Sequence, residues 1–397
     1  MGRSLRLGVR RREEDTLAKS AYLIMVAIFF VFVACHKENR QVEQLMENGI
    51  EVIVNHPQPA KLKTFELEQE LVIDLSSNEL VQRGLADPAA FDVDSEGNIY
   101  VWSQTSNQDH VFKFSSTGTY IAAFGRTGQG PGEVQFLANV MFDSNDELMV
   151  VDSQQRKLVY FDRSGAYLRQ RISLMRLLLV IPLRDGNYIT GTQTSIPGEI
   201  FNRIILNVCD SDFNVINEIG QLRYYRPNAE QSFPAVNPTS IIQVSKNIIF
   251  FANSEKGYEI ECFDKRGKLT RVIRKDFAPV PLSGKNKEVL NERYLRFPPE
   301  IRNKVVYPTV LPPFQTGFAD EDGRLYIMTN EESDVNGQYW HDIFDEKGIF
   351  IGRVCIGNYG IYGKFQGFLF TLARNGRLYH FRENRDGFKE LVVSRMQ

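Results

Sequence analysis

The chain has 397 residues, of which 43% are hydrophobic and 12% aromatic, and its formal net charge is −2 at pH 7. This composition is ample for a packed core and excludes an intrinsically disordered chain, and the length allows one large domain or two ordinary ones. The slightly acidic balance gives no reason to expect a nucleic acid as a partner.

The first 34 residues are unlike the rest of the chain. Five arginines and Lys19 precede an unbroken apolar run, Ala21–Ala34, which is the layout of a secretion signal. A run of this length rises only about 21 Å as a helix, short of the roughly 30 Å hydrocarbon layer, so a membrane-spanning helix is the weaker interpretation. We therefore predict a signal peptide over residues 1–34.

The end of this leader, Phe32-Val33-Ala34-Cys35, resembles a bacterial lipobox, although Phe32 departs from the usual Leu or Val. The resemblance implies cleavage before Cys35 and attachment of a lipid to its sulfur. The protein would then contact a membrane through a lipid anchor, as a periplasmic or outer-membrane lipoprotein. An ordinary cleaved signal with an incidental cysteine is the alternative. Residues 35–63 would form a tether and lead-in to a folded part over residues 64–397.

An internal repeat dominates that folded part. A short polar turn that feeds a strand occurs six times, as DSEGNIYVW (94–102), DSNDELMVV (143–151), RDGNYITG (184–191), SKNIIFFA (245–252), DEDGRLYIM (320–328) and ARNGRLYHF (373–381). A second strand–turn–strand signature follows the first five copies, as in KFSSTGTYI (113–121) and YFDRSGAYL (160–168). Together with an apolar stretch before each first turn, every unit is predicted to be four antiparallel strands.

Six such units without helical patterning between them indicate an all-β fold, a six-bladed β-propeller of four-stranded antiparallel blades. The sixth unit lacks a last strand, because FKELVVSRM (388–396) runs to the end of the chain. ELVIDLS (70–76) lies before the first unit and is well placed to supply that strand and close the ring. Two independent β-sandwiches are the weaker alternative.

The stretch GRTGQGPGE (125–133) has the glycine density of a phosphate-binding loop but not its spacing. Glu133 stands where the dinucleotide fingerprint needs its third glycine, and no Gly-Lys pair is followed by Ser or Thr. We interpret the stretch as the crossing between the first two blades, where glycine allows sharp turns.

Residues 124–168, which include this crossing and the second unit, resemble an NHL-type repeat. The whole mature chain is similar to the six-bladed propeller lipoproteins of Gram-negative bacteria. The resemblance implies the fold and an exported location, and it brings no set of catalytic residues.

Long connections are predicted at one end of the ring, because the first and third turns of each unit are tight and the remaining connections are long. We expect ligand or partner binding there, since loops on a rigid scaffold commonly carry function. The candidate residues are Arg126, Gln129, Arg223, Tyr224, Tyr225, Arg226, Tyr294, Phe297, Tyr307 and Phe314.

The largest of these connections, Lys275–Thr316, is an insertion with a predicted helix from Ser283 to about Arg296. The proline-rich segments after it, near residues 298–300 and 307–314, predict extended chain. The insertion could be a lid over the channel, or a decoration that packs its aromatic residues on its own blade. A solvated linker is the simpler interpretation of residues 223–233.

Catalytic signals are sparse. The five histidines have no metal-ligand spacing, and no nucleophile motif occurs. Hairpin-turn capping is the simpler interpretation of Asp92, Asp94, Asp143 and Asp320. The cysteines after the leader are widely spaced, so Cys209 and Cys262 are predicted to be core residues rather than a disulfide.

The sequence therefore favours a non-catalytic, lipid-anchored exported propeller that binds a protein, peptide or glycan and needs no cofactor. A lyase or lactonase-like hydrolase with Ca²⁺ or Zn²⁺ in the central channel is the alternative. A structural subunit of a surface complex is a third possibility.

Overall fold

A computed structural model describes residues 41–57, 63–85, 87–103, 108–173, 177–196, 198–334, 338–357, 371–384 and 386–396. The predicted signal peptide and Cys35 lie outside these residues. The chain forms two compact units, Met1–Glu43 and Gln44–Gln397, and the fold below is that of the second.

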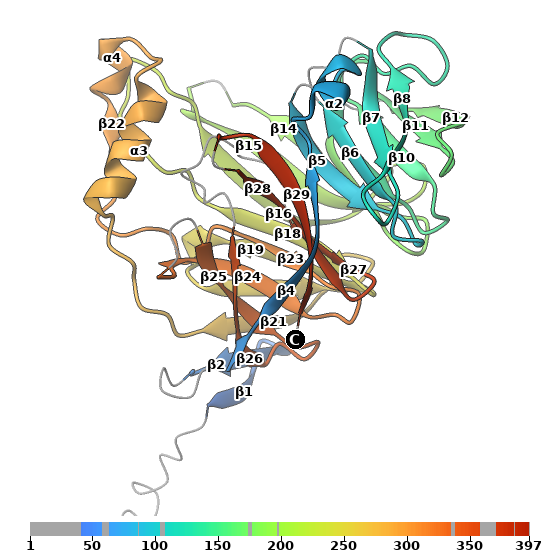
Figure 1. The fold of residues 1–397 in the computed structure, drawn as a ribbon. Coiled ribbons are helices and arrows are strands. Elements are labelled where there is room, and N and C mark those ends of the chain that lie inside the picture. Colours follow the sequence, from blue (N-terminus) through green and yellow to red (C-terminus); the bar gives the residue numbers. More distant parts are fainter. Residues whose placement is uncertain are drawn as a thin grey trace, which may run out of the picture. The chain divides into compact units, whose positions relative to one another are not determined.

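Six blades, each built on four antiparallel strands, make up this unit (Figure 1), and we number them 1 to 6 in chain order. Blade 1 contains β5 (Pro88–Val93), β6 (Ile99–Ser103), β7 (Asp109–Phe114) and β8 (Tyr120–Arg126). Blade 2 contains β9 (Leu137–Phe142), β10 (Leu148–Asp152), β11 (Lys157–Phe161) and β12 (Tyr167–Ile172). Blade 3 contains β13 (Leu177–Pro182), β14 (Tyr188–Thr194), β15 (Phe201–Cys209) and β16 (Val215–Tyr225).

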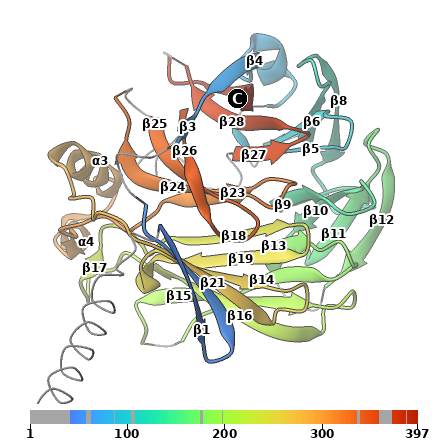
Figure 2. The same ribbon diagram turned by 90° about the horizontal axis from the view of Figure 1, so that it is seen from below.

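The remaining three blades follow the same order. Blade 4 contains β18 (Ser240–Ser245), β19 (Ile248–Asn253), β20 (Glu259–Phe263) and β21 (Leu269–Lys275). Blade 5 contains β23 (Thr316–Ala319), β24 (Leu325–Glu332), β25 (Gln338–Phe344) and β26 (Phe350–Gly357). Blade 6 contains β27 (Thr371–Arg374), β28 (Arg377–Glu383), β29 (Lys389–Met396) and β4 (Leu67–Asp74). We call the four strands of each blade A to D, and Figure 2 shows A toward the centre of the ring and D at its edge.

The predicted ring closure is confirmed. The N-terminal strand β4 pairs antiparallel with the C-terminal β29, with Ile73 opposite Leu391. Blade 6 therefore takes its D strand from the other end of the chain, as the ELVIDLS stretch predicts.

Each blade packs against both neighbours, which explains the unbroken apolar runs of the B and C strands. In β6, Ile99 and Val101 face blade 6, whereas Tyr100 and Trp102 face blade 2. Six clusters of buried side chains fill the six interfaces between consecutive blades. Burial of each large apolar side chain stabilises the fold by roughly 1.5–3 kcal/mol, so the ring is held mainly by these clusters.

The segment before β4 lies along the outside of two further blades. β2 (Ile50–Asn55) adds in parallel to β21 of blade 4, with β1 (Val42–Glu47) beside it, and β3 (Thr64–Phe65) adds to β26 of blade 5. Asn55 is fully buried and bonds to both blades: its amide donates to the Arg274 carbonyl (3.2 Å) and the Gly348 carbonyl (3.0 Å).

The insertion after blade 4 forms a small layer with a core of its own. The predicted helix is present as α3 (Gly284–Tyr294), with the Ser283 hydroxyl capping it by accepting from the Asn286 N–H (3.1 Å). The prediction of extended chain after it is wrong at one point, because Pro299 begins a short helix, α4 (Pro299–Arg302), at a position that tolerates proline. β17 (Phe233–Pro234) and β22 (Val305–Val306) pair in parallel and tie the insertion to the chain before blade 4.

Two short helical segments complete the described fold. α2 (Asn78–Gln82) places Leu80 in the cluster between blades 6 and 1, and a 3-10 turn, η2 (Ser254–Lys256), follows β19. Within the described residues, no helix is long and apolar enough to cross a membrane.

Candidate functional site

A cavity of about 610 Å³ lies at the centre of the ring. All six A strands line it, and each contributes at least one residue: Asp92, Met141, Ile181, Val244, Ala319 and Leu372. Residues of the A–B turns, such as Asp143, Arg184 and Lys246, form its rim. The cavity therefore opens among the tight A–B turns, at the opposite end of the strands from the long connections.

Asp92 is the one charged residue at its register position in the six A strands. It lies opposite Tyr100, and the corresponding residues of blades 2 to 6 are all apolar: Met141, Ile181, Val244, Phe318 and Leu372. The Asp92 carboxylate is buried, and burial raises its pKa, opposed by Arg374 and two backbone N–H groups.

The bonds of Asp92 join three blades. Its Oδ2 accepts from the Phe142 N–H of blade 2 (2.8 Å), and its Oδ1 accepts from its neighbour Val93 (2.8 Å). Arg374 of blade 6 lies 3.3 Å from Oδ1 and also donates to the Val93 carbonyl. Since every oxygen of the buried carboxylate has a donor, we interpret Asp92 as a clip for the ring rather than a proton-transfer group.

The other aspartates behave as the sequence predicts. Asp94, Asp143 and Asp320 begin A–B turns, and each accepts from the backbone N–H groups two and four residues later. The prediction of turn capping is confirmed for these three and is wrong for Asp92, which lies inside a strand. Its place in the repeat, two residues before the turn aspartate, is the signal that separates it.

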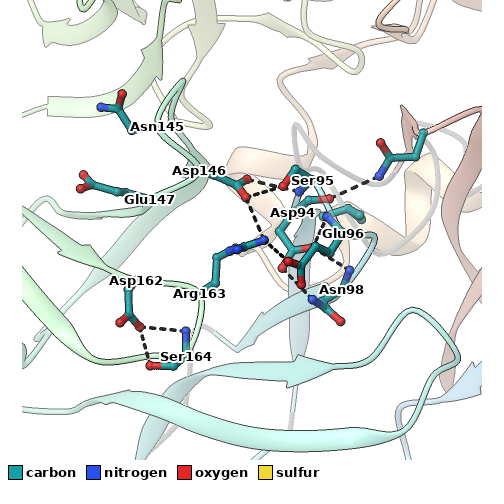
Figure 3. A network of polar contacts seen from close by, with 12 residues as sticks. Asp94, Ser95, Glu96, Asn98, Asn145, Asp146, Glu147, Asp162, Arg163 and Ser164 are labelled. Carbon is teal, nitrogen blue, oxygen red and sulfur yellow. Dashed lines mark hydrogen bonds and ion pairs between the residues drawn. The ribbon is translucent and has the colours of Figure 1, made fainter.

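A polar network joins the A–B turns of blades 1 and 2 near the cavity rim (Figure 3). Asp146 accepts from the Ser95 hydroxyl (2.6 Å) and backbone N–H (3.2 Å). Arg163, from the C–D turn of blade 2, points between Glu96 (2.6 Å) and Asp146 (3.5 Å). These charged groups are paired across the interface between blades 1 and 2. They therefore stabilise the rim and are not available to bind a ligand.

The rim keeps charges of both signs that have no such pairing. Arg184 of blade 3 is exposed, and no ion pair involves it among the residues that the structure describes. Asp143 of blade 2 bonds only to backbone N–H groups of its own turn in the described contacts. The mouth therefore presents a cation and an anion on neighbouring blades.

The glycine-rich crossing is a closed loop with no room for a phosphate. The Glu133 carboxylate folds back and accepts from the Gly130 N–H (2.8 Å), and a Cβ on Gly128 would collide with that carboxylate. Gln155 donates to the Gly128 carbonyl (2.7 Å). The crossing needs glycines because Glu133 fills the loop, and Gly125 and Gly132 also have positive φ as predicted for sharp turns.

The candidate residues of the first two long connections do not gather into one site. Arg126 and Gln129 are exposed on the crossing between blades 1 and 2. On β16 of blade 3, Arg223 pairs with Glu255 (2.6 Å) and the Tyr224 hydroxyl accepts from Asn202 (2.9 Å). Arg226 is exposed just after that strand.

The aromatic candidates of the insertion lie inside it rather than on its surface. Tyr294 is buried in the insertion's core, and Tyr225, Phe297 and Tyr307 pack against that core. Phe314 is fully buried between blades 4 and 5 and is not available to a ligand. Of the two interpretations of the insertion, the structure favours a decoration that packs its own aromatic residues.

The cysteines match their prediction. Cys209, Cys262 and Cys355 are free thiols, and the first two are buried. Burial raises the pKa of Cys262 to about 12, which keeps it a neutral thiol at physiological pH.

Two buried histidines face one another across the interface between blades 5 and 6. His341 has its Nδ1 at 3.0 Å from the Tyr339 carbonyl, whereas its Nε2 and the Nδ1 of His380 have no hydrogen-bond partner among the residues that the structure describes. Burial lowers the pKa of His341 to about 4 and that of His380 to about 3. Within the described residues, no group of three or more His, Cys, Asp or Glu side chains could hold a metal ion.

These histidines predict acid sensitivity. Below about pH 6.5 the unfolded chain binds two protons that the folded chain does not bind until about pH 4 and 3. As the pH is lowered below about 6.5, the free energy of unfolding should therefore fall by about 1.4 kcal/mol per pH unit for each histidine, until the pH reaches the pKa of that histidine in the folded chain. Denaturant unfolding between pH 7 and 4 should show a steeper decline for the native chain than for the double variant H341L/H380L. Equal slopes for the two chains would contradict this assignment.

Comparison with known proteins agrees with the six sheets. A protein-family model described as a 6-bladed beta-propeller matches residues 93–250, which run from blade 1 into blade 4. The chain is a six-bladed β-propeller. None of the curated proteins matches it in sequence.

Several solved structures are similar to this propeller. One is a protein of Bacteroides fragilis provisionally described as exported, 12% identical, with a TM-score of 0.51 over 87% of this chain and 99% of that one. A gluconolactonase of Xanthomonas campestris is 12% identical, with a TM-score of 0.41 over 85% of this chain and 98% of that one. Virginiamycin B lyase of Staphylococcus aureus is 12% identical, with a TM-score of 0.37 over 82% and 88%. At such identities the likeness concerns the fold alone.

Proposed function

We propose that this propeller is an exported, lipid-anchored binding protein that takes a short peptide segment at the mouth of its central cavity and performs no chemistry on it. The observation that carries the proposal is the cavity of about 610 Å³ on a rigid ring of six A strands. A cavity of this size is typical of ligand sites, and this one is lined by apolar and by polar side chains in comparable measure.

The charges of the mouth favour a peptide over a neutral glycan. Arg184 and Asp143 offer a cation and an anion on neighbouring blades, which suits a ligand that carries both signs. Met141, Ile181 and Leu372 line the wall below and suit apolar side chains. The buried carboxylate of Asp92 is engaged with three donors, so the wall offers binding surface rather than an acid–base pair.

The packing of the long connections moves the proposed site away from the face that the sequence favours. Phe314 and Tyr294 are buried in cores, and Arg223 is paired with Glu255. Arg226 remains exposed at that face and serves as a matched control for Arg184.

The binding test compares two arginines at opposite ends of the ring. Tetrapeptides of defined charge and neutral disaccharides are titrated calorimetrically into the purified chain. We expect peptides with an acidic end to bind, R184E to weaken them at least tenfold, and R226E to leave them unchanged. Loss of binding in R226E alone would move the site to the long connections, and binding of disaccharides alone would replace peptide with glycan. Metal-dependent conversion of a bound ligand would replace this proposal with the enzymatic alternative.

The anchor rests on the leader, where an apolar run ends at Cys35. Intact-mass analysis of protein extracted from membranes should show a mature chain that begins with an acylated Cys35. A mature N-terminus at another residue would rule the anchor out and leave the binding site untouched.

A further inference from the structure

The C–D turns of this propeller make the same kind of contact at five of the six interfaces between blades, and the interface between blades 5 and 6 lacks it. In blades 1 to 5, the tight turn between strands C and D packs against the preceding blade. In blade 2, Arg163 of this turn accepts at its carbonyl from the Tyr100 hydroxyl (2.9 Å) and from Lys113 (2.7 Å) of blade 1. The glycines of these turns also lie close to the preceding blade. In blade 1, for example, a Cβ on Gly118 would meet Ile73 of blade 6 at 3.1 Å.

In the turns of blades 2, 4 and 5, the second residue also complements the A–B turn of the preceding blade in charge. Arg163 of blade 2 pairs with Glu96 of blade 1 (2.6 Å), and Lys265 of blade 4 lies 3.5 Å from Asp185 of blade 3. In blade 5 the signs are reversed, and Glu346 pairs with Lys246 of blade 4 (3.0 Å).

Blade 6 has no C–D turn. Its C strand, β29, ends at Met396, and its D strand, β4, begins at Leu67, so no turn joins the two strands. At the place where that turn would meet blade 5, the structure has a cavity of about 280 Å³, which we call the socket. Its floor is apolar and comes from both blades: Phe318, Tyr326, Val354, Ile356, Leu378 and Met396.

The socket keeps the contact groups that the other interfaces use. Asp320 and Tyr326 of blade 5 repeat Asp94 and Tyr100 of blade 1, and in both pairs the hydroxyl lies 3.1 Å from the aspartate. In blade 1 the tyrosine hydroxyl also bonds to the carbonyl of the incoming turn. The Tyr326 hydroxyl has instead the Met396 sulfur at 3.9 Å, so the position of that carbonyl is not filled by a backbone group in the described contacts.

The acidic partner of a turn cation is also present. Asp322 holds the place in its A–B turn that Glu96 and Asp185 hold in theirs. Its side chain is 75% exposed, and Arg324 of its own turn lies 3.8 Å from its carboxylate, a long ion pair. Glu96 and Asp185 each have a cation from the next blade, whereas blade 6 supplies none to Asp322 in the described part of the chain.

We propose that the socket is a docking site for a tight β-turn of a partner protein that carries Lys or Arg at its second position. The partner's turn takes the place of the absent C–D turn of blade 6. Its cation pairs with Asp322, its carbonyl accepts from Tyr326, and its small residue lies on the apolar floor. The chain's own turn in blade 2, Asp162–Gly165, makes these contacts at the interface between blades 1 and 2, and it therefore serves as the pattern for the occupant of the socket.

A hairpin of the chain's own sequence is the sharpest probe. A cyclised peptide of residues 160–168, YFDRSGAYL, is titrated into the full chain and compared with the same peptide carrying R163E. The native hairpin should bind, and R163E should bind at least tenfold more weakly. In the D322K chain the preference should reverse, because the charge at the socket is reversed. Asp322 is exposed, so D322K should unfold at the same denaturant concentration as the native chain.

The controls separate this site from the central cavity. R184E, at the cavity rim, should leave hairpin binding unchanged. Failure of both hairpins to bind, or an unchanged preference in D322K, would overturn the docking proposal. A concentration-dependent dimer in ultracentrifugation that D322K abolishes would also overturn it, by assigning the socket to a second copy of this chain.

Discussion

The variant I73D is expected to lose at least about 4 kcal/mol of unfolding free energy, since it opens the ring at its seam. Ile73 of β4 is buried between blades 6 and 1 and lies opposite Leu391 of β29. Truncation of such a side chain alone costs about 2–5 kcal/mol, and an unpaired carboxylate in the same place adds a desolvation penalty. Urea unfolding, followed by the fluorescence of Trp102 and Trp340 and by circular dichroism, measures the loss.

A matched variant on the same strand separates the seam from a general effect. Glu68 is exposed on β4, and E68Q should change the unfolding free energy by no more than about 0.5 kcal/mol. Opening of the seam should also make the C-terminal strand β29 the first site of limited proteolysis in I73D. An unfolding midpoint of I73D equal to that of the native chain would show that β4 is not needed for closure.

The repeat made this architecture predictable, because the B and C strands of a blade must be apolar on both faces. The run Ile99–Trp102 and its counterparts are buried between two neighbouring blades. In blades 1, 2, 3 and 5 an aspartate such as Asp94 fixes the polar turn before the run. These local signals recur six times, so errors in one blade do not change the fold. The closing strand was predictable for the same reason, since the sixth copy lacks its fourth strand.

The site was less predictable because it depends on contacts between blades. Asp92 and Asp94 are both aspartates near a turn in the sequence, yet only the register of the strands shows that Asp92 points into the ring and meets Arg374. The exposure of side chains was equally hard to predict. Phe314 and Tyr294 lie in long connections, but segments distant in the sequence cover them. Loop length therefore did not predict which aromatic residues are exposed, because a long connection can bury its aromatic residues in a core of its own.

The pairing of β2 and β3 with blades 4 and 5 also had no local signal. The pattern of polar and apolar residues over residues 50–55 does not distinguish a strand of the ring from a free tether. The partner strand, β21, lies about 220 residues further along the chain, as Glu51 opposite Arg271 shows. Parallel addition to an edge strand is fixed by tertiary contacts such as those of Asn55, which a single sequence does not reveal.

The second large effect is expected for D342N, which removes the charge at the centre of a buried network between blades 4 and 5. Asp342 is fully buried, and three groups meet it: Lys275 at 3.1 Å, Arg353 at 2.7 Å and the Tyr258 hydroxyl at 2.7 Å. Arg353 keeps a second carboxylate, Glu331, in D342N, but Lys275 is left with one carbonyl acceptor at 3.3 Å. Breaking a buried pair in this way costs about 3–5 kcal/mol, because an uncompensated charge stays in the interior.

A double-mutant cycle tests whether that unpaired cation causes the loss. In the variant D342N/K275M the orphaned ammonium is replaced by an apolar chain of similar length, so much of the stability lost in D342N should return. The matched control D386N lies on an exposed turn of blade 6 and should have an effect within about 0.5 kcal/mol. Additive losses in D342N/K275M would contradict the coupling and would leave the apolar cluster, rather than the ion pair, as the reason that blades 4 and 5 stay together.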